Sequence, residues 1–294
     1  MKAAERKLVG KSNDDERLAY VGGGKKPDLD APLFGPGSPT WRVNREATLL
    51  LAGGRALLLQ VAHPLVAAAV AEHSSFRTRP LERLFRTLDL TLTVVFRPAR
   101  EALAAVRKIE RVHDQVHGVL REEVGVFPRG TPYDANDPEL LFWVHATLVD
   151  SALLGYEKFV GRLRTDEKAE FYEESKVVAR LFGIPPRWIP RDWRAFRDYW
   201  AERIEGPVLE VGKDAREIAH ALFSPRLPPG LRHFLGFVQR ATLDLLPEEI
   251  LDRFGFVRPR LTISRLAPLV RGTLPLWPGF LRYFPHARRA GVGR

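Results

Sequence analysis

The chain has 294 residues, and its 45% hydrophobic content is enough to form a substantial core. It contains no cysteine, which excludes disulfides, thiolate-ligated haem, iron–sulfur clusters, cysteine-type zinc sites and a cysteine nucleophile. The formal net charge is +10, but residues 255–294 hold eight Arg and no acidic residue, so this basic C-terminal part contributes +8 and the rest of the chain only +2.

Residues 1–33 are predicted to form a flexible, polar N-terminal arm. Charged residues within Met1–Lys7 stand where a secretory leader needs its apolar segment, so we expect no export signal and a cytoplasmic location. The longest uncharged stretch, Ala56–Ala71, is shorter than the roughly 18 apolar residues that a membrane-spanning helix needs. No transmembrane helix is therefore predicted.

Helix signals dominate the rest of the chain. Ser38 and Pro39 combine a capping hydroxyl with a proline at the first helical position, and the helical pattern runs on to Gly53-Gly54. Asp137-Pro138 repeats this start signal. Further helices are predicted at about 54–74, 80–97, 99–118 and 138–161.

The second half continues in the same way. A helix opens at Thr165 and ends at Gly183, and Asp192 caps another helix that carries Trp193, Phe196 and Trp200 on one face. The later helices are shorter and interrupted by prolines. No strand alternation of useful length, internal repeat or linker divides the chain. The predicted fold is all-α, with a single helical domain over residues 34–294.

The basic C-terminal part has three interpretations: packing on the protein's own body, contact with anionic lipid, or nucleic-acid binding, in that order of preference. Its aromatic and Arg residues favour an interface over a free coil, while its prolines prevent one continuous amphipathic helix. We therefore expect no nucleic-acid partner and consider a peripheral membrane contact through residues 255–294.

Histidines at helical spacing on apolar segments indicate a buried cofactor site, because imidazole is the commonest neutral metal ligand and side chains four apart share a helix face. The candidates are His63, His113, His117 and His145. Structural alternatives are a core histidine at a helix kink for His63 and a solvated helix end for the pair His113 and His117. Val112 and Val116 are expected to place His113 on a buried face.

Arg83, Arg86 and Thr87 form a basic and polar trio, three and four residues apart, on a helix that is otherwise apolar. Burying two guanidinium groups is costly unless anions or polar ligands meet them. The trio is therefore a candidate catalytic group. The alternative is a set of salt bridges to Glu72, Glu82 or Asp89.

Five motifs in order resemble the rubber oxygenase (latex-clearing protein) family, which includes the mycophenolic-acid-pathway oxygenase. They are Gly54-Arg55-x4-Gln60-x-Ala62-His63-Pro64, Glu72-His73-Ser74, Arg83-x-x-Arg86-Thr87, Val112-His113-x-x-Val116-x-Gly118 and Trp143-Val-His145-Ala-Thr147. The resemblance covers residues 34–205. It implies an all-helical fold that encloses a buried b-type haem, and cleavage of isoprenoid carbon–carbon double bonds with dioxygen.

The resemblance also implies roles for single residues. His113 matches the histidine that ligates the haem iron, Arg83 and Thr87 match the polar pair of the distal pocket, and His145 is expected near the haem. Arg86 stands where latex-clearing proteins have a lysine that can close over the iron, and His117 stands where arginine is usual. His63 and His117 complete the predicted cofactor-binding set, and Glu72 is the candidate for the family's distal glutamate.

The predicted function is a haem-dependent oxygenase that acts with dioxygen on an unsaturated, apolar, isoprenoid-like or lipid-like substrate. One alternative is a di-iron carboxylate oxidase, since Glu110-x-x-His113 and Glu217-x-x-His220 are two Glu-x-x-His pairs of the kind such proteins place on two helices. The other alternative is a non-catalytic, haem-binding, membrane-associated protein whose functional surface is the basic C-terminal part.

Overall fold

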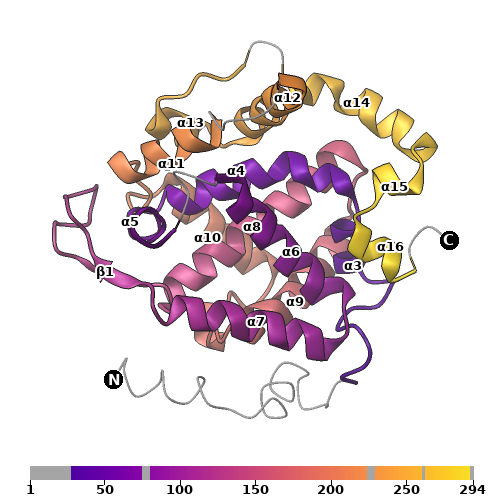
Figure 1. Ribbon diagram of the computed structural model, residues 1–294, viewed down its shortest axis with the longest axis horizontal. Coiled ribbons are helices and arrows are strands. Elements are labelled where there is room, and N and C mark those ends of the chain that lie inside the picture. Colours follow the sequence, from indigo (N-terminus) through magenta and orange to yellow (C-terminus); the bar gives the residue numbers. More distant parts are fainter. Residues whose placement is uncertain (1–27, 75–79, 224–228, 260–261, 292–294) are drawn as a thin grey trace.

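The computed structural model describes residues 28–74, 80–223, 229–259 and 262–291. The side chains of residues 80–84, 229–234 and 264 are not described. The described part of the chain is mostly helical (Figure 1). The helices before the hairpin are α3 Pro39–Asn44, α4 Leu50–Val61, α5 Pro64–His73, α6 Pro80–Phe96 and α7 Ala99–His113, with the 3-10 turn η1 at Ala47–Leu49. Then follow β1 His117–Val119, β2 Pro132–Asp134, α8 Pro138–Phe159, α9 Thr165–Leu181, η2 Pro186–Trp188, α10 Trp193–Glu205 and α11 Lys213–Phe223. The last are α12 Pro229–Leu245, α13 Glu248–Phe254, α14 Ile263–Thr273, η3 Leu274–Leu276, α15 Gly279–Arg282 and α16 Pro285–Arg289.

The predicted helix starts are confirmed. The Ser38 hydroxyl accepts a hydrogen bond from the Trp41 amide at 3.1 Å, and the Asp192 carboxylate accepts one from the Ala195 amide at 2.8 Å. The Asp137 carboxylate does the same for the Glu139 amide at 2.9 Å, directly before Pro138. Each cap satisfies an amide that has no partner inside its own helix.

The prediction that the first helix runs from Ser38 to Gly53-Gly54 was wrong. This helix ends at Asn44, and Gly53 and Gly54 lie inside α4. A Cβ atom on Gly54 would collide with the Thr242 hydroxyl of α12. Gly54 therefore allows α4 and α12 to approach closely, and it does not stop a helix.

The predicted helix 54–74 is broken in two at Pro64, because proline lacks the amide that would continue α4. Among the described residues no single helix is long and apolar enough to cross a membrane. The segments Ala47–Val61 and Pro64–His73 pass that test only together, by length and composition, and they are bent by 103° at the break.

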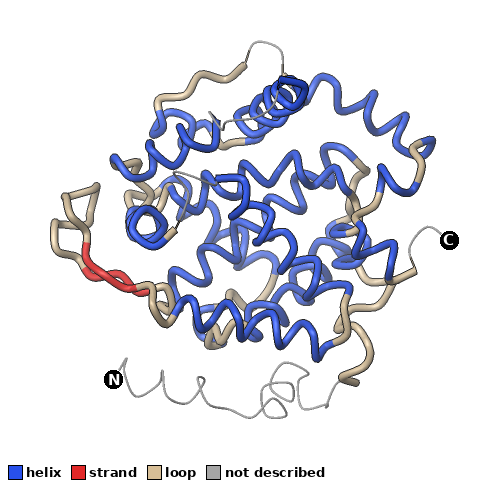
Figure 2. The backbone as a smooth tube through the Cα atoms, in the orientation of Figure 1, coloured by secondary structure: helices blue, strands red, loops and turns tan. Residues whose placement is uncertain are grey.

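The helix predicted at 99–118 ends at His113, and a small hairpin follows. Strands β1 and β2 pair antiparallel with Gly118 opposite Tyr133, and they form the sheet that Figure 2 shows in red. This hairpin was not predicted, because strands of three residues are too short to show alternation in the sequence.

Helix α4 lies at the centre of the core, with ten of its twelve residues buried. It packs against α8 on one side and α12 on the other. Its one charged side chain, Arg55, donates to the Asp150 carboxylate at 2.6 Å, to the Ser151 hydroxyl at 2.6 Å and to the Leu245 carbonyl at 2.8 Å. This buried ion pair ties α4 to α8 and to the end of α12.

Aromatic rings of α10 close the core on the side of α8 and α9. Trp200 stacks on Trp143 with ring centroids 5.7 Å apart, and Phe196 lies 4.8 Å from the Tyr172 ring. The predicted aromatic face of this helix therefore packs inward. Stacked and tilted rings at these separations stabilise the core beyond simple burial.

Both ends of the described chain lie against the body. The carbonyls of Ala31 and Leu29 accept hydrogen bonds from the first amides of α7, so residues 28–33 are attached, and residues 1–27 of the predicted arm lie outside the described residues. At the other end, the Arg282 guanidinium pairs with the fully buried Glu46 carboxylate at 3.1 Å, and Phe284 is buried. The described residues around Arg282 pack on the body, which was the first interpretation of the basic C-terminal part.

Replacing Asp150 with Ala leaves the Arg55 guanidinium buried without a carboxylate, and it should lower the free energy of unfolding by about 3–5 kcal/mol. The matched control is Arg197→Ala, because Arg197 binds the same carboxylate at 3.0 Å with a side chain that is 49% exposed. This control should cost about 1 kcal/mol or less. Urea denaturation of the two variants compares the costs, and equal costs would contradict a central role for Arg55.

Candidate functional site

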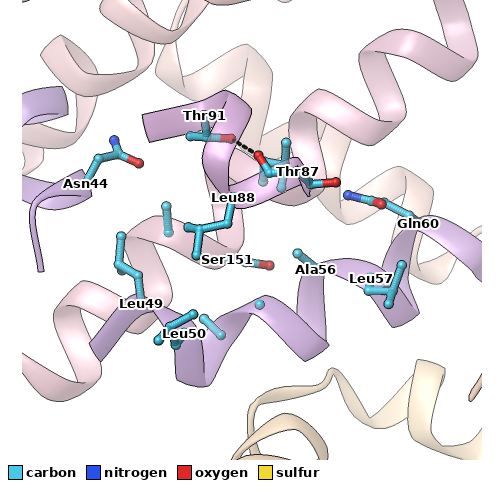
Figure 3. A pocket seen from close by; sticks show the side chains of 14 residues that line it. Asn44, Leu49, Leu50, Ala56, Leu57, Gln60, Thr87, Leu88, Thr91 and Ser151 are labelled. Atoms are coloured by element: carbon cyan, nitrogen blue, oxygen red, sulfur yellow. Dashed lines mark hydrogen bonds between the residues drawn. The ribbon is translucent and has the colours of Figure 1, made fainter. Parts of the chain in front are cut away.

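A cavity lies between α4, α6 and α8 and holds about 90 Å³ (Figure 3). Its walls are mostly leucine and alanine side chains from these helices and η1. The residues that line it are Asn44, Leu49, Leu50, Ala52, Gly53, Ala56, Leu57, Gln60, Thr87, Leu88, Thr91, Leu148, Ser151 and Ala152. Such an apolar space with a few polar groups is typical of a site for a small apolar ligand.

Three of the polar residues in this wall make hydrogen bonds within the protein. The Ser151 hydroxyl accepts from Arg55 at 2.6 Å, the Thr91 hydroxyl donates to the Thr87 carbonyl at 3.0 Å, and the Asn44 amide donates to the Thr40 carbonyl at 2.9 Å. These groups are part of the scaffold. They leave the apolar character of the cavity unchanged.

Gln60 is different. Its side chain is 4% exposed, it lines the cavity, and no hydrogen bond of its amide is found within the described part of the chain. Figure 3 shows the Gln60 amide and the Thr87 side chain pointing toward one another at one end of the cavity. An amide that faces a cavity and has no partner among the described residues can hydrogen-bond a polar atom of a bound molecule.

The members of the predicted trio on α6, Arg83, Arg86 and Thr87, do not all face the cavity. Thr87 lines the cavity. Arg86 is exposed and is not among the lining residues, since neighbouring positions on a helix point about 100° apart. Arg83 stands one turn before Thr87 on α6, and its side chain lies outside the described residues.

His113 is the last residue of α7 and is half-buried. A two-residue loop joins α6 to α7 and the two helices pack together, so His113 lies at the end of α7 away from that loop. The expectation that Val112 lies on a buried face was wrong, since its side chain is 54% exposed. The prediction of a shared helix face with His117 was also wrong: α7 ends at His113, and His117 is an exposed residue of β1.

His145 lies on α8, and its Nε2 atom is buried with no hydrogen-bond partner. Burial lowers the pKa of this imidazole to about 4, so it is neutral at pH 7. A neutral imidazole with an unused nitrogen has the chemistry of a metal ligand. The structure thus describes an unpartnered imidazole nitrogen at one of the predicted positions.

His63 has a structural role at the break between α4 and α5. Its Nδ1 atom accepts a hydrogen bond from the Leu65 amide at 3.3 Å and caps α5. Burial, and then the nearby Arg203 charge, lower the pKa of His63 to about 3. The structural alternative for His63, a hydrogen-bonded core histidine at a kink, is therefore what the structure shows.

Glu72, the candidate for the distal glutamate, is exposed and bound to the hairpin region. Its carboxylate accepts from the Tyr133 hydroxyl at 2.7 Å and from Arg121 at 3.1 Å, and these hydrogen bonds lower its pKa. It does not line the cavity. The di-iron alternative also finds no support, because the described residues contain no group of three or more His, Asp or Glu that could hold a metal ion.

Comparison with known proteins supports the resemblance. A family model described as "ER-bound oxygenase mpaB/B'/Rubber oxygenase, catalytic domain" matches residues 41–272. Two uncharacterized proteins, from Mycobacterium bovis and Mycobacterium tuberculosis, are each 26% identical over 176 residues, which is 58% of this chain and 66% of each relative. The match therefore spans just under two thirds of the relatives' own length. No solved structure matches the chain.

The two buried histidines predict how stability depends on pH. The unfolded chain protonates them near the ordinary histidine pKa of 6.5, whereas the folded protein keeps His145 neutral to about 4 and His63 to about 3. The unfolded state therefore binds more protons below pH 6.5, and the free energy of unfolding should fall as pH falls, by up to about 1.4 kcal/mol per pH unit for each histidine.

His145→Phe removes one of these two contributions and should flatten the slope between about pH 6.5 and 4.5. Urea denaturation at a series of pH values measures this slope. Identical slopes for the wild-type protein and the variant would show that His145 does not titrate as its burial requires.

Proposed function

We propose, since this chain belongs to the family of mpaB and rubber oxygenase catalytic domains, that it is a haem-dependent oxygenase that uses dioxygen to oxidise an unsaturated, apolar substrate. The observation that supports this most directly is the apolar cavity beside Thr87, a residue of the family motif. The haem and the isoprenoid-like or lipid-like substrate are our proposal.

The cavity suits a hydrocarbon segment. Its lining offers leucine and alanine surface with few polar groups, and a hydrophilic substrate would find little to bind. Its 90 Å³ is well below the roughly 300 Å³ at which pockets for drug-sized ligands begin. The cavity by itself therefore does not hold a porphyrin, and we assign it to part of the substrate or to dioxygen.

The histidines supply donors of the chemistry that haem requires. On the family motif, His113 would hold the haem iron, and His145 would lie near the haem as the second imidazole. The buried, unpartnered Nε2 of His145 and its lowered pKa, which keeps the imidazole neutral at pH 7, support this proposal. A bound haem would supply the activation of dioxygen.

The protein's own residues would then position the reactants. The Gln60 amide and the Thr87 side chain, at one end of the cavity, are placed to hold a polar atom of the bound molecule, while Leu57 and Leu88 exclude water from its apolar part. From the motif, Arg83 would contribute a positive charge where dioxygen binds. Arg86 cannot close over the iron as a lysine amine can, because guanidinium is not deprotonated in proteins.

The function is tested by incubating haem-loaded, reduced protein with isoprenoid lipids under ¹⁸O₂ and analysing the products. We expect labelled carbonyl products and consumption of oxygen. Haem-loaded protein that consumes no oxygen and gives no labelled product would contradict catalysis, and it would favour the non-catalytic haem-binding alternative.

His113→Ala should abolish haem binding while the protein stays folded, because the variant removes the proposed iron ligand. Haem content per chain, measured by the pyridine haemochrome method, and circular dichroism check both parts. His220→Ala, at an exposed position on α11, is the matched control and should keep its haem. If His113→Ala retains haem and His145→Ala loses it, the two histidines exchange roles.

Gln60→Leu should lower turnover without lowering stability, because it removes an amide for which no hydrogen bond is found among the described residues. The free energy of unfolding should be unchanged or higher, whereas product formation from the lipid should fall about tenfold, equivalent to the loss of one hydrogen bond of about 1.4 kcal/mol. Thr91→Val, at a lining residue whose hydroxyl bonds within α6, is the control. A destabilised Gln60→Leu protein with normal turnover would assign the amide to the fold instead.

A further inference from the structure

The C-terminal helices expose large apolar side chains along one edge of the molecule. Helices α14, α15 and α16 follow that edge in yellow in Figure 1. Leu276 is 83% exposed, Leu269 65% and Phe280 64%. Leu266, Trp277 and Leu281 are exposed beside them in sequence, and we call these six residues the C-terminal apolar surface.

This surface belongs to a segment that is fixed on the protein. On the inner side of α14 and η3, Ile263, Ala267 and Leu274 are buried. The Arg271 guanidinium donates to the carbonyls of Glu157 and Lys158, at the end of α8, at 3.0 and 2.9 Å. The segment therefore already has an apolar inner face in the core, and its outward residues form a second apolar face.

The charge of the same segment is one-sided. Arg258 and Arg282 are paired with Glu248 and Glu46. Arg265, Arg288 and Arg289 are exposed, and no ion pair of theirs is found among the described residues. Residues 255–294 contain no acidic side chain that could neutralise them.

Exposed leucine, phenylalanine and tryptophan beside unpaired arginines match the boundary of an anionic bilayer. There the apolar side chains enter the acyl region while guanidinium groups bind lipid phosphates. Nucleic acid would use the arginines but would leave Leu269 and Leu276 in water. We propose that the C-terminal apolar surface docks the protein peripherally on an anionic membrane. This proposal is independent of the haem and of the oxygenase activity.

The test is co-sedimentation of the full-length protein with phosphatidylcholine vesicles that contain or lack phosphatidylserine. The wild-type protein should bind the anionic vesicles, and high salt should weaken the binding. The double variant Leu276→Ser with Phe280→Ser should reduce the partition coefficient at least tenfold. Arg288→Gln with Arg289→Gln should reduce binding to anionic vesicles specifically.

Val126→Ser is the matched control, because Val126 is 52% exposed in the loop between the strands, on the other side of the molecule in Figure 1. It should bind vesicles as the wild type does, and circular dichroism should show all variants folded. Wild-type protein that does not sediment with anionic vesicles, or a Leu276/Phe280 variant that binds them normally, would overturn the proposal. A wild-type dimer that this variant converts to a monomer in light scattering, without vesicle binding, would assign the surface to a second copy.

Discussion

The buried ion pair between Arg55 and Asp150 is the constraint on which the rest of the structure depends. Arg55 is the only charged residue of the central helix, and its guanidinium is satisfied by α8 and by the last carbonyl of α12. Removing either partner strands a charge in the core, so the register of α4 against α8 is fixed. These two helices form two walls of the cavity, so the same ion pair fixes the distance between its walls.

The hydrogen bonds of the polar residues that line the cavity distinguish those that stabilise the fold from a candidate ligand-binding residue. Ser151 lines the cavity but is used by Arg55, and Thr91 is used by its own helix. The Gln60 side chain also lines the cavity, and no hydrogen-bond partner of its amide is found among the described residues. An amide that faces the cavity without a protein partner can hydrogen-bond a polar atom of a molecule bound there.

The sequence predicted those features that depend on local chemistry. The caps at Ser38, Asp137 and Asp192 are side-chain to backbone bonds within three residues, so they were visible in the chain alone. The role of Gly54 was not, because it depends on Thr242, almost two hundred residues away. The end of α7 at His113 was not predicted either, because Gly118 suggested that the helix ends there. The prediction that His113 and His117 share a helix face was wrong for the same reason. Thr87 was predicted at the site and lines the cavity, whereas Gln60 was quoted only as part of a motif. The sequence feature that could have identified Gln60 as a site residue is a single amide side chain within the uncharged stretch from Ala56 to Ala71.

The central claim is that this helical frame holds a haem beside the cavity of Gln60 and Thr87. It combines the family membership with a neutral, unpartnered imidazole at His145 and a half-buried His113 at the end of α7. The most direct test is the optical spectrum of the wild-type protein, produced with added haem precursor, together with haem quantitation per chain. The account predicts a Soret band and about one haem per chain, as a single iron-binding histidine, His113, would give. Folded protein without a Soret band and without haem would contradict it.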